Sequence, residues 1–182
     1  MRWVAGIALA AALAAGAGCG GPGTVKSVSR TPPRPVDRVD RIDLWLVPPA
    51  AVNWDDEPGP DGVLAQVFFG QVERPEPVLV KGAVDFLLFE GKVQRADVAT
   101  KQPFHTWTFT PQELATRLVR SMVGWGYRVE LGWGKRVPAS PAITLAARYQ
   151  PKEGPPVYSS PVAIPMPTSG PSAPVKQIGP TP

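Results

Sequence analysis

Apolar and polar residues alternate with a period of two along the middle of the chain. The alternation is clearest at 125–133, where one face holds an apolar row: Trp125, Tyr127, Val129, Leu131 and Trp133. Further apolar segments, separated by turn residues, lie at 42–47, 63–69, 77–80, 84–89, 104–109 and 143–149. β-Branched and aromatic residues dominate these segments, which favours strands over helices.

One segment has the period of a helix instead. Thr110 and Glu113 form a capping box around Pro111, which occupies the first helical position. Apolar residues then recur every four positions, at Leu114, Leu118 and Met122. Gly124 is placed to end the helix. We therefore expect one α-helix over 111–123.

About seven short strands with turn signals between them predict a mainly β fold, an Ig/transthyretin-like β-sandwich into which the helix is inserted. A further edge strand is expected over 162–166. Pro161 and Pro165 flank or end this segment, and proline is tolerated in a sheet only at an edge.

The distribution of proline indicates where the folded domain begins and ends. Of 24 prolines, eight lie in 22–60 and ten in 151–182, which leaves six for the 89 residues of 61–149. Proline lacks a backbone donor and fixes φ, so dense proline opposes regular structure. We therefore expect a flexible tether at 19–40, a sandwich domain at 41–150 and a proline-rich tail at 151–182.

The N-terminus has the layout of a secretory signal. Arg2 is followed by an uncharged apolar run, and small residues precede Cys19, the only cysteine of the chain. The sequence Gly16-Ala17-Gly18-Cys19 resembles the lipobox of bacterial lipoproteins, in which the cysteine becomes the lipid-bearing N-terminus. This resemblance implies a signal peptide at 1–18, acylation of Cys19 and attachment to a membrane of the cell envelope. The outer membrane is the expected one where there are two.

Two alternatives to a lipidated N-terminus stay open. The first is an ordinary secretory signal with a cysteine nearby by chance. The second is a retained membrane helix, but the apolar run is shorter than the ~20 residues that span a bilayer. A single unpaired thiol is unusual in an exported domain, and acylation of Cys19 would account for it.

Charge and residue types argue against several classes of function. The net charge is +4, and 61–149 holds 11 Lys/Arg against 8 Asp/Glu without a basic run. Nucleic-acid binders concentrate cations in runs or on one face, so we expect no nucleic-acid partner. His105 is the only histidine, no Gly-x-Ser-x-Gly motif occurs, and one histidine with one cysteine cannot make a metal site. We expect neither an enzyme nor a cofactor.

The candidate ligand-binding residues lie in and near one acidic loop. Asp55, Asp56 and Asp61 carry oxygen ligands of the kind that hard cations prefer, although their spacing does not match an EF-hand loop and a structural loop is the favoured interpretation. Trp45 and Trp54 are the tryptophans expected to be exposed, and a flat aromatic face suits a sugar ring. Burial of both tryptophans would exclude a glycan site.

The leading hypothesis is a non-enzymatic envelope lipoprotein that is anchored to the bilayer through acylated Cys19 and binds another envelope component, a protein or a glycan. The alternative is a glycan- or peptide-binding module of the envelope. Anchor and fold together loosely resemble the transthyretin-like sandwich lipoproteins that serve the assembly of secretion machines. That likeness carries over no individual residue.

Overall fold

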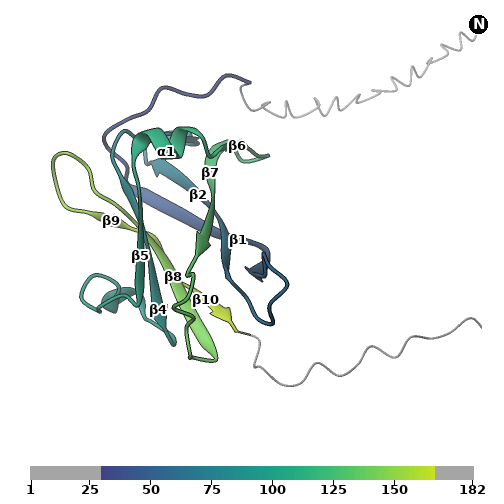
Figure 1. Cartoon of the computed structure of the whole chain (residues 1–182). Helices are drawn as coiled ribbons and strands as arrows, with labels where there is room; N and C mark the ends of the chain where they lie inside the picture. Colours follow the sequence, from purple (N-terminus) through teal and green to yellow (C-terminus); the bar gives the residue numbers. More distant parts are fainter. Residues whose placement is uncertain (1–29, 167–182) are drawn as a thin grey trace, which may run out of the picture.

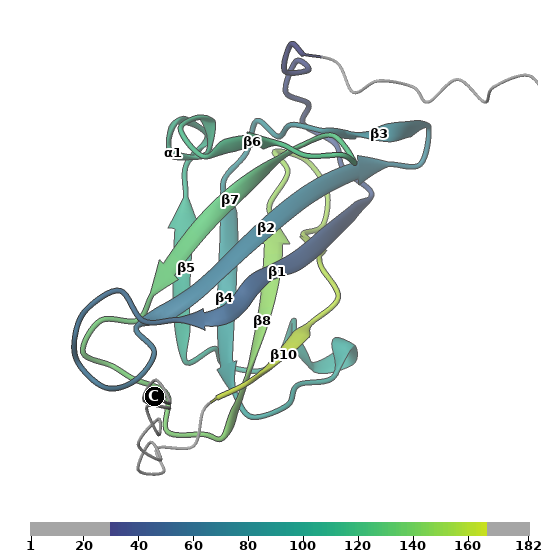
Figure 2. The same ribbon diagram turned by 90° about the vertical axis from the view of Figure 1, so that its right-hand side faces the viewer.

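The computed structural model describes residues 30–166, so Cys19, the predicted signal peptide and the tail beyond Met166 lie outside the described residues. Two antiparallel sheets of five strands each pack face to face (Figures 1 and 2). The first sheet has the order β1 (Arg41–Val52), β2 (Gly62–Gln71), β7 (Trp125–Gly132) and β6 (Leu118–Arg120), with β3 (Arg74–Val78) also paired to β2. The second has the order β10 (Val162–Pro165), β8 (Ala142–Tyr149), β4 (Val84–Glu90) and β5 (His105–Phe109), with β9 (Val157–Tyr158) also paired to β8.

The β-sandwich expected from the alternating pattern is confirmed, and the part of the chain that the structure describes holds ten strands in place of about seven. The apolar row predicted for 125–133 faces the other sheet, and Val129 and Leu131 are fully buried. The second sheet contributes Phe86 and Leu88 from β4, which lies between β5 and β8. Inward-facing residues of both sheets therefore form one core.

The predicted helix is wrong in length. α1 (Pro111–Ala115) has the expected capping box, in which the backbone N–H of Glu113 donates to Thr110 Oγ1 at 3.3 Å and the Thr110 N–H donates to the Glu113 carboxylate at 2.8 Å. Residues 118–120 do not continue the helix. They form the strand β6, because they pair with β7 and their backbone groups are hydrogen-bonded in the sheet. Gly124 has the positive φ expected of a helix terminus, but it closes the β6–β7 hairpin.

No helix among residues 30–166 is long and apolar enough to cross a membrane.

The packed domain extends beyond the predicted limits of 41 and 150. Val36 forms a parallel bridge with Val80, and Val39 is buried. At the other end of the chain, β9 and β10 both pair with β8, and β10 occupies the edge expected for 162–166. These proline-rich segments join the sheets because the buried backbone N–H and C=O groups at the sheet margins need hydrogen-bond partners.

The first strand also continues past the point where it was expected to stop. β1 includes Pro48 and Pro49, and its pairing register with β2 shifts between Leu46 and Ala51. β1 is the last strand of its sheet, and both prolines lie in the interval where the pairing with β2 is interrupted, so they remove no hydrogen bond from the regular ladder.

A second, smaller apolar cluster covers part of the outer face of the second sheet. It consists of Leu87, Phe89, Val93, Val98 and Ala146, with Tyr158 packed against it. The chain between β4 and β5 supplies Val93 and Val98 and contains a short 3-10 helix, η1 (Arg95–Asp97). On the same outer face, Asp85 accepts hydrogen bonds from Arg148 at 2.7 and 2.9 Å and from Thr108 at 2.6 Å. The hydrogen bond to Asp85 raises the pKa of Arg148.

Candidate functional site

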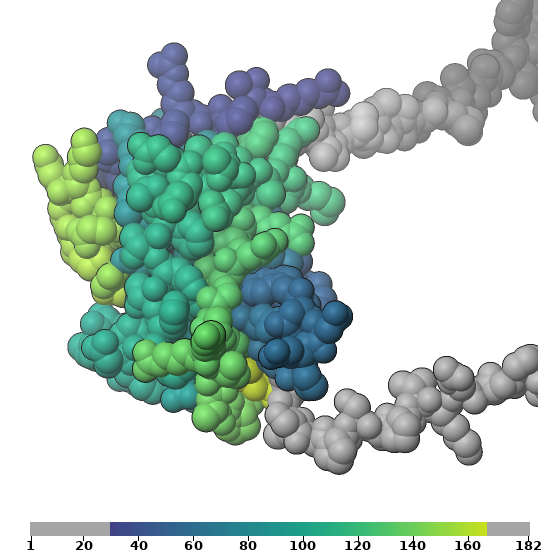
Figure 3. All heavy atoms as spheres, viewed as in Figure 1, coloured from purple at the N-terminus to yellow at the C-terminus, as the bar shows by residue number. Residues whose placement is uncertain are grey.

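A groove of about 1090 Å³ lies at one end of the sandwich. It lies between the β1–β2 loop, residues 53–61, and the β7–β8 loop, residues 133–141. Figures 1 and 2 place these loops at the end opposite α1 and the N-terminal segment, and Figure 3 shows the β1–β2 loop in dark blue as a projection from that end. We call this hollow the loop groove.

Trp54 forms one wall of the loop groove, and two glycines determine how it lies. Gly62 and Gly132 are paired across β2 and β7. A Cβ built on Gly62 would overlap the Trp54 ring, and one on Gly132 would lie 3.4 Å from Trp54 Cζ3. The indole therefore packs on the bare backbone of the two strands, while 45% of the residue stays exposed toward the groove. An aromatic ring held in this way loses little conformational entropy when it binds a ligand.

The carboxylates of the β1–β2 loop hold the loop itself together. Asp61 Oδ2 accepts the backbone N–H of Trp54 at 2.5 Å and that of Asp55 at 3.2 Å. Asp55 Oδ1 accepts the N–H of Glu57 at 2.8 Å, and Asn53 Nδ2 donates to the Glu57 carbonyl at 2.6 Å. The contact between Asp55 and Glu57 is an Asx-type turn, and together with the bonds to Asp61 it favours a structural role for the acidic loop. In residues 30–166 no group of three or more His, Cys, Asp or Glu side chains is arranged to hold a metal ion.

The base of the groove is fixed by a buried tryptophan. Trp133 is 3% exposed and donates from Nε1 to the Pro60 carbonyl at 3.0 Å, while its own N–H donates to the Asp61 carbonyl at 3.0 Å. Trp107 Nε1 donates to the Gly132 carbonyl at 2.9 Å. The two loops are therefore hydrogen-bonded to one another where they leave the sheet, and the end of β7 is hydrogen-bonded to β5.

The groove walls combine apolar surface with a negative balance of charge. Pro58, Pro60, Val137 and Pro141 contribute apolar surface, and Met166 lies at one rim. The charged lining residues are Asp55, Glu57, Asp61 and Lys135. Three carboxylates against one ammonium give a balance of −2, which favours a neutral or cationic ligand over an anionic one.

The predicted site residues are only partly brought together. Trp54, Asp55 and Asp61 line the loop groove, whereas Asp56 is exposed outside the lining. Trp45 is 48% exposed but lies on the outer face of the first sheet, where its ring centroid is 4.9 Å from that of Phe68. Both tryptophans are exposed as expected, so the condition that would have excluded a glycan site is not met.

Trp45 has a packing partner that accounts for its place. Phe68 points to the outer face of the first sheet and is nevertheless 2% exposed. A Cβ on Gly126 would lie 2.6 Å from Phe68 Cδ1, so the phenyl ring rests on the backbone of β7. Trp45 covers part of the remaining ring. We therefore assign Trp45 to the sheet surface and exclude it from the loop groove.

The one histidine lies in β5, outside the loop groove. His105 is half-buried and packs against Trp107, with ring centroids 4.4 Å apart and the ring planes tilted by 43°.

The β7–β8 loop, which forms the second wall of the groove, was not predicted from the sequence. Lys135, Val137 and Pro138 belong to a loop more than 70 residues away from Trp54 along the chain. Gly62 and Gly132 are adjacent only because β2 pairs with β7. An isolated glycine within a strand pattern often marks a close approach to the backbone, and both glycines carried that signal.

The role of the loop groove is inferred from its residues and their geometry. Scans of protein-family models, of curated proteins and of solved structures each returned no match to this chain.

Proposed function

We propose that the chain is a non-enzymatic lipoprotein of the bacterial cell envelope, anchored through acylated Cys19, whose sandwich binds another envelope component in the loop groove. The observation that carries the binding role is Trp54, which is fixed on Gly62 and Gly132 and open toward a groove at the end opposite the N-terminal segment. A chain tethered at one end presents a groove at the other end to partners away from the membrane.

The anchor is supported by the sequence and by what the fold does not need. Cys19 follows an apolar run and a small-residue cleavage pattern. The described domain has a continuous apolar core and contains no cysteine, so its stability does not require the thiol. Lipid attachment is the role that remains for Cys19. Since one acyl chain binds only marginally to a bilayer and several anchor stably, the expected modification carries more than one chain.

Mass spectrometry of the membrane fraction tests the anchor. The wild-type chain should begin at Cys19 and carry the mass of a diacylglyceryl-type modification. Cys19→Ser should appear without that mass and should be released from the membrane fraction. An unmodified wild-type chain that begins at another residue would refute the anchor.

Chemical cross-linking and pull-down from the native envelope test the binding role. Trp54→Ala and Trp45→Ala remove rings of nearly equal exposure, 45% and 48%, from the groove and from the sheet face. We expect Trp54→Ala to lose the captured component and Trp45→Ala to retain it. Equal capture by both variants would exclude the loop groove as the binding site.

A neutral glycan is the second candidate ligand, and the position of Trp54 favours it. Trp54 offers an indole beside Asp55 and Glu57, and carboxylates accept hydrogen bonds from sugar hydroxyl groups. Titration of neutral oligosaccharides into the protein should change tryptophan emission in the wild type and in Trp45→Ala, but not in Trp54→Ala. A change that persists without Trp54 would refute the glycan assignment.

A further inference from the structure

Large apolar side chains that are exposed in residues 30–166 gather in distinct places. Trp54 and Val137 line the loop groove, and Trp45 covers Phe68. The remaining three lie at the tips of two hairpins: Val72, Met122 and Val123, with exposed fractions of 84%, 96% and 45%. Hairpin tips ordinarily carry Gly, Asn, Asp, Ser or Pro, so apolar residues there need a separate explanation.

The tip of the β6–β7 hairpin is held in an outward position. Ser121 and Gly124 exchange backbone hydrogen bonds of 2.9 and 3.3 Å, which leaves Met122 and Val123 as the two tip residues. Gly124 has φ +136°, and a Cβ there would lie 2.6 Å from Pro77 Cδ. The hairpin therefore rests against β3 at Gly124, and Met122 projects beyond this contact into solvent.

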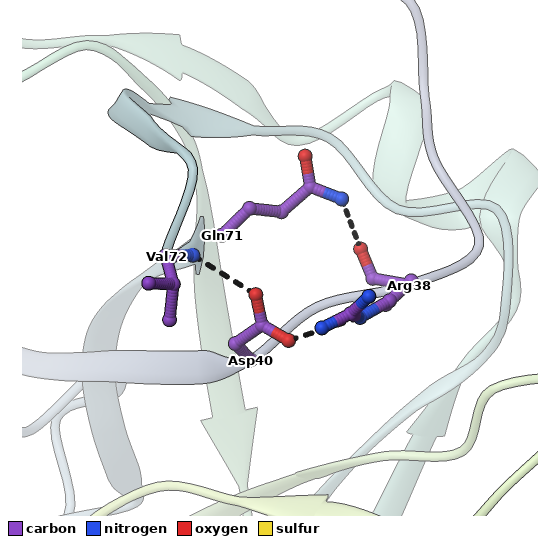
Figure 4. A network of polar contacts seen from close by, with 4 residues as sticks. All are labelled: Arg38, Asp40, Gln71 and Val72. Atoms are coloured by element: carbon purple, nitrogen blue, oxygen red, sulfur yellow. Dashed lines mark hydrogen bonds and ion pairs between the residues drawn. The ribbon is translucent and has the colours of Figure 1, made fainter.

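The β2–β3 hairpin carries Val72 and is attached to the segment that leads to Cys19. The Val72 N–H donates to Asp40 Oδ2 at 2.9 Å, and Gln71 Nε2 donates to the Arg38 carbonyl at 2.8 Å (Figure 4). Arg38 Nε also donates to Asp40 Oδ1 at 3.1 Å. The Val72 N–H, together with Arg38, holds the pKa of Asp40 below its ordinary value, so the carboxylate stays ionised and the attachment persists near neutral pH.

The length of chain before the described domain limits how far these tips can lie from Cys19. Positions 19 and 30 are eleven residues apart, and eleven residues reach at most about 40 Å when fully extended. A Gly-rich chain of that length has an average span of about 17–20 Å. The N-terminal segment reaches the sandwich at the end that carries α1, β3 and β6, as Figures 1 and 2 show.

We propose that this end of the sandwich faces the bilayer and that Val72, Met122 and Val123 enter its interfacial layer. The inference rests on the proposed acylation of Cys19, which places the hairpin tips within reach of lipid. Apolar side chains at an interface gain from burial in the headgroup–acyl boundary. A membrane that lies against this end would leave the loop groove pointing away from it.

The hairpin tips themselves are apolar in character, since the charged residues that flank them, together with those of the attached segment 38–40, balance. Arg38, Arg74 and Arg120 are matched by Asp40, Glu73 and Glu76. Three positive and three negative side chains give no net attraction to an anionic surface. Insertion should therefore depend little on the fraction of anionic lipid or on salt.

A single-cysteine fluorescence experiment on the lipidated, full-length chain tests the proposal. Acylation blocks Cys19, so Met122→Cys supplies one free thiol for an environment-sensitive dye. Val137→Cys is the matched control, because Val137 is 55% exposed and lies in the loop groove at the opposite end. Both labelled variants are reconstituted into vesicles of phosphatidylethanolamine and phosphatidylglycerol that contain brominated lipids as quenchers.

We expect the dye at position 122 to shift its emission to shorter wavelength and to be quenched severalfold more than the dye at position 137. The quenching at position 122 should be unchanged when phosphatidylglycerol is omitted. A lipidated chain with equally weak quenching at both positions refutes the membrane contact while leaving the anchor intact. Label uptake at Cys19 by the wild type refutes the anchor and, with it, the proposal. Circular dichroism confirms that each variant is folded.

Discussion

The paired glycines beneath Trp54 give the most discriminating test of how the loop groove is built. Gly62→Ala and Gly132→Ala add the same methyl group at positions that face each other across β2 and β7. The Gly62 methyl would meet the Trp54 ring and would lie 2.5 Å from the Leu131 carbonyl oxygen, which belongs to the backbone of β7. The Gly132 methyl would meet Trp54 Cζ3 at 3.4 Å and the Asp61 carbonyl oxygen at 3.8 Å, which are ordinary contacts.

These distances predict opposite effects on stability. Overpacking against a fixed backbone costs about 1–3 kcal/mol, and alanine returns about 0.4–1 kcal/mol by restricting the unfolded chain. Gly62→Ala should therefore lose about 1–2 kcal/mol, or about 3–8 °C in Tm for a domain of this size. Gly132→Ala should be neutral or slightly stabilising.

Differential scanning calorimetry measures the two melting temperatures, and tryptophan emission reports the displacement of Trp54 in Gly62→Ala. The double variant Gly62→Ala/Trp54→Ala separates the two contacts of the new methyl group, because removal of the ring leaves only the clash with Leu131. A Gly62→Ala variant as stable as Gly132→Ala would refute the packing of Trp54 on the strand backbone.

Three other predictions concern the elements that support this architecture. Gly124→Ala should lose more than 1 kcal/mol, because φ is +136° and Pro77 occupies the space of a Cβ; urea denaturation measures the loss, and stability equal to wild type would contradict the contact. Thr110→Ala should lose about 1 kcal/mol by removal of the cap, whereas Thr110→Ser should retain most of it; equal melting temperatures for the two variants would argue against the capping box. The lowered pKa of Asp40 means that its contribution to stability is present above its ordinary pKa of 3.8 and is lost as pH falls through the folded-state value. Melting curves from pH 2 to 7 should therefore show a shallower acid dependence for Asp40→Asn than for wild type, and parallel curves would exclude this role.

The strands could be predicted from the sequence because each carries its own local signal. Alternation alone placed the inward-facing residues of β7, since the side-chain period of a strand does not depend on its neighbours. The length of the helix was overestimated because periodicity along the chain takes no account of pairing with a distant segment. Leu118 fits a helical period of four from Leu114, but the same residue pairs with Tyr127, and pairing between segments outweighs a periodicity of three residues.

Only one wall of the loop groove could be predicted from the sequence, because the other wall depends on the pairing of distant strands. An exposed Trp54 and a turn-forming acidic loop could be expected from local composition, and the exposure of Trp54 is confirmed. The opposing wall comes from the β7–β8 loop, which meets Trp54 only through the β2–β7 pairing. Trp45 has nearly the same exposure as Trp54, and only the fold shows that it covers Phe68.

The prolines at the margins of the two sheets bear on how copies of this chain behave side by side. Pro48 and Pro49 lie in β1, and Pro165 ends β10, so these two edge strands have gaps in their rows of backbone donors. A strand edge without continuous donors is a poor template for a strand from another molecule. Lipid anchoring would confine many copies to a plane, where collisions between edges are frequent. Interrupted edges would allow such crowding without edge-to-edge aggregation, because no long ladder of intermolecular hydrogen bonds can form there.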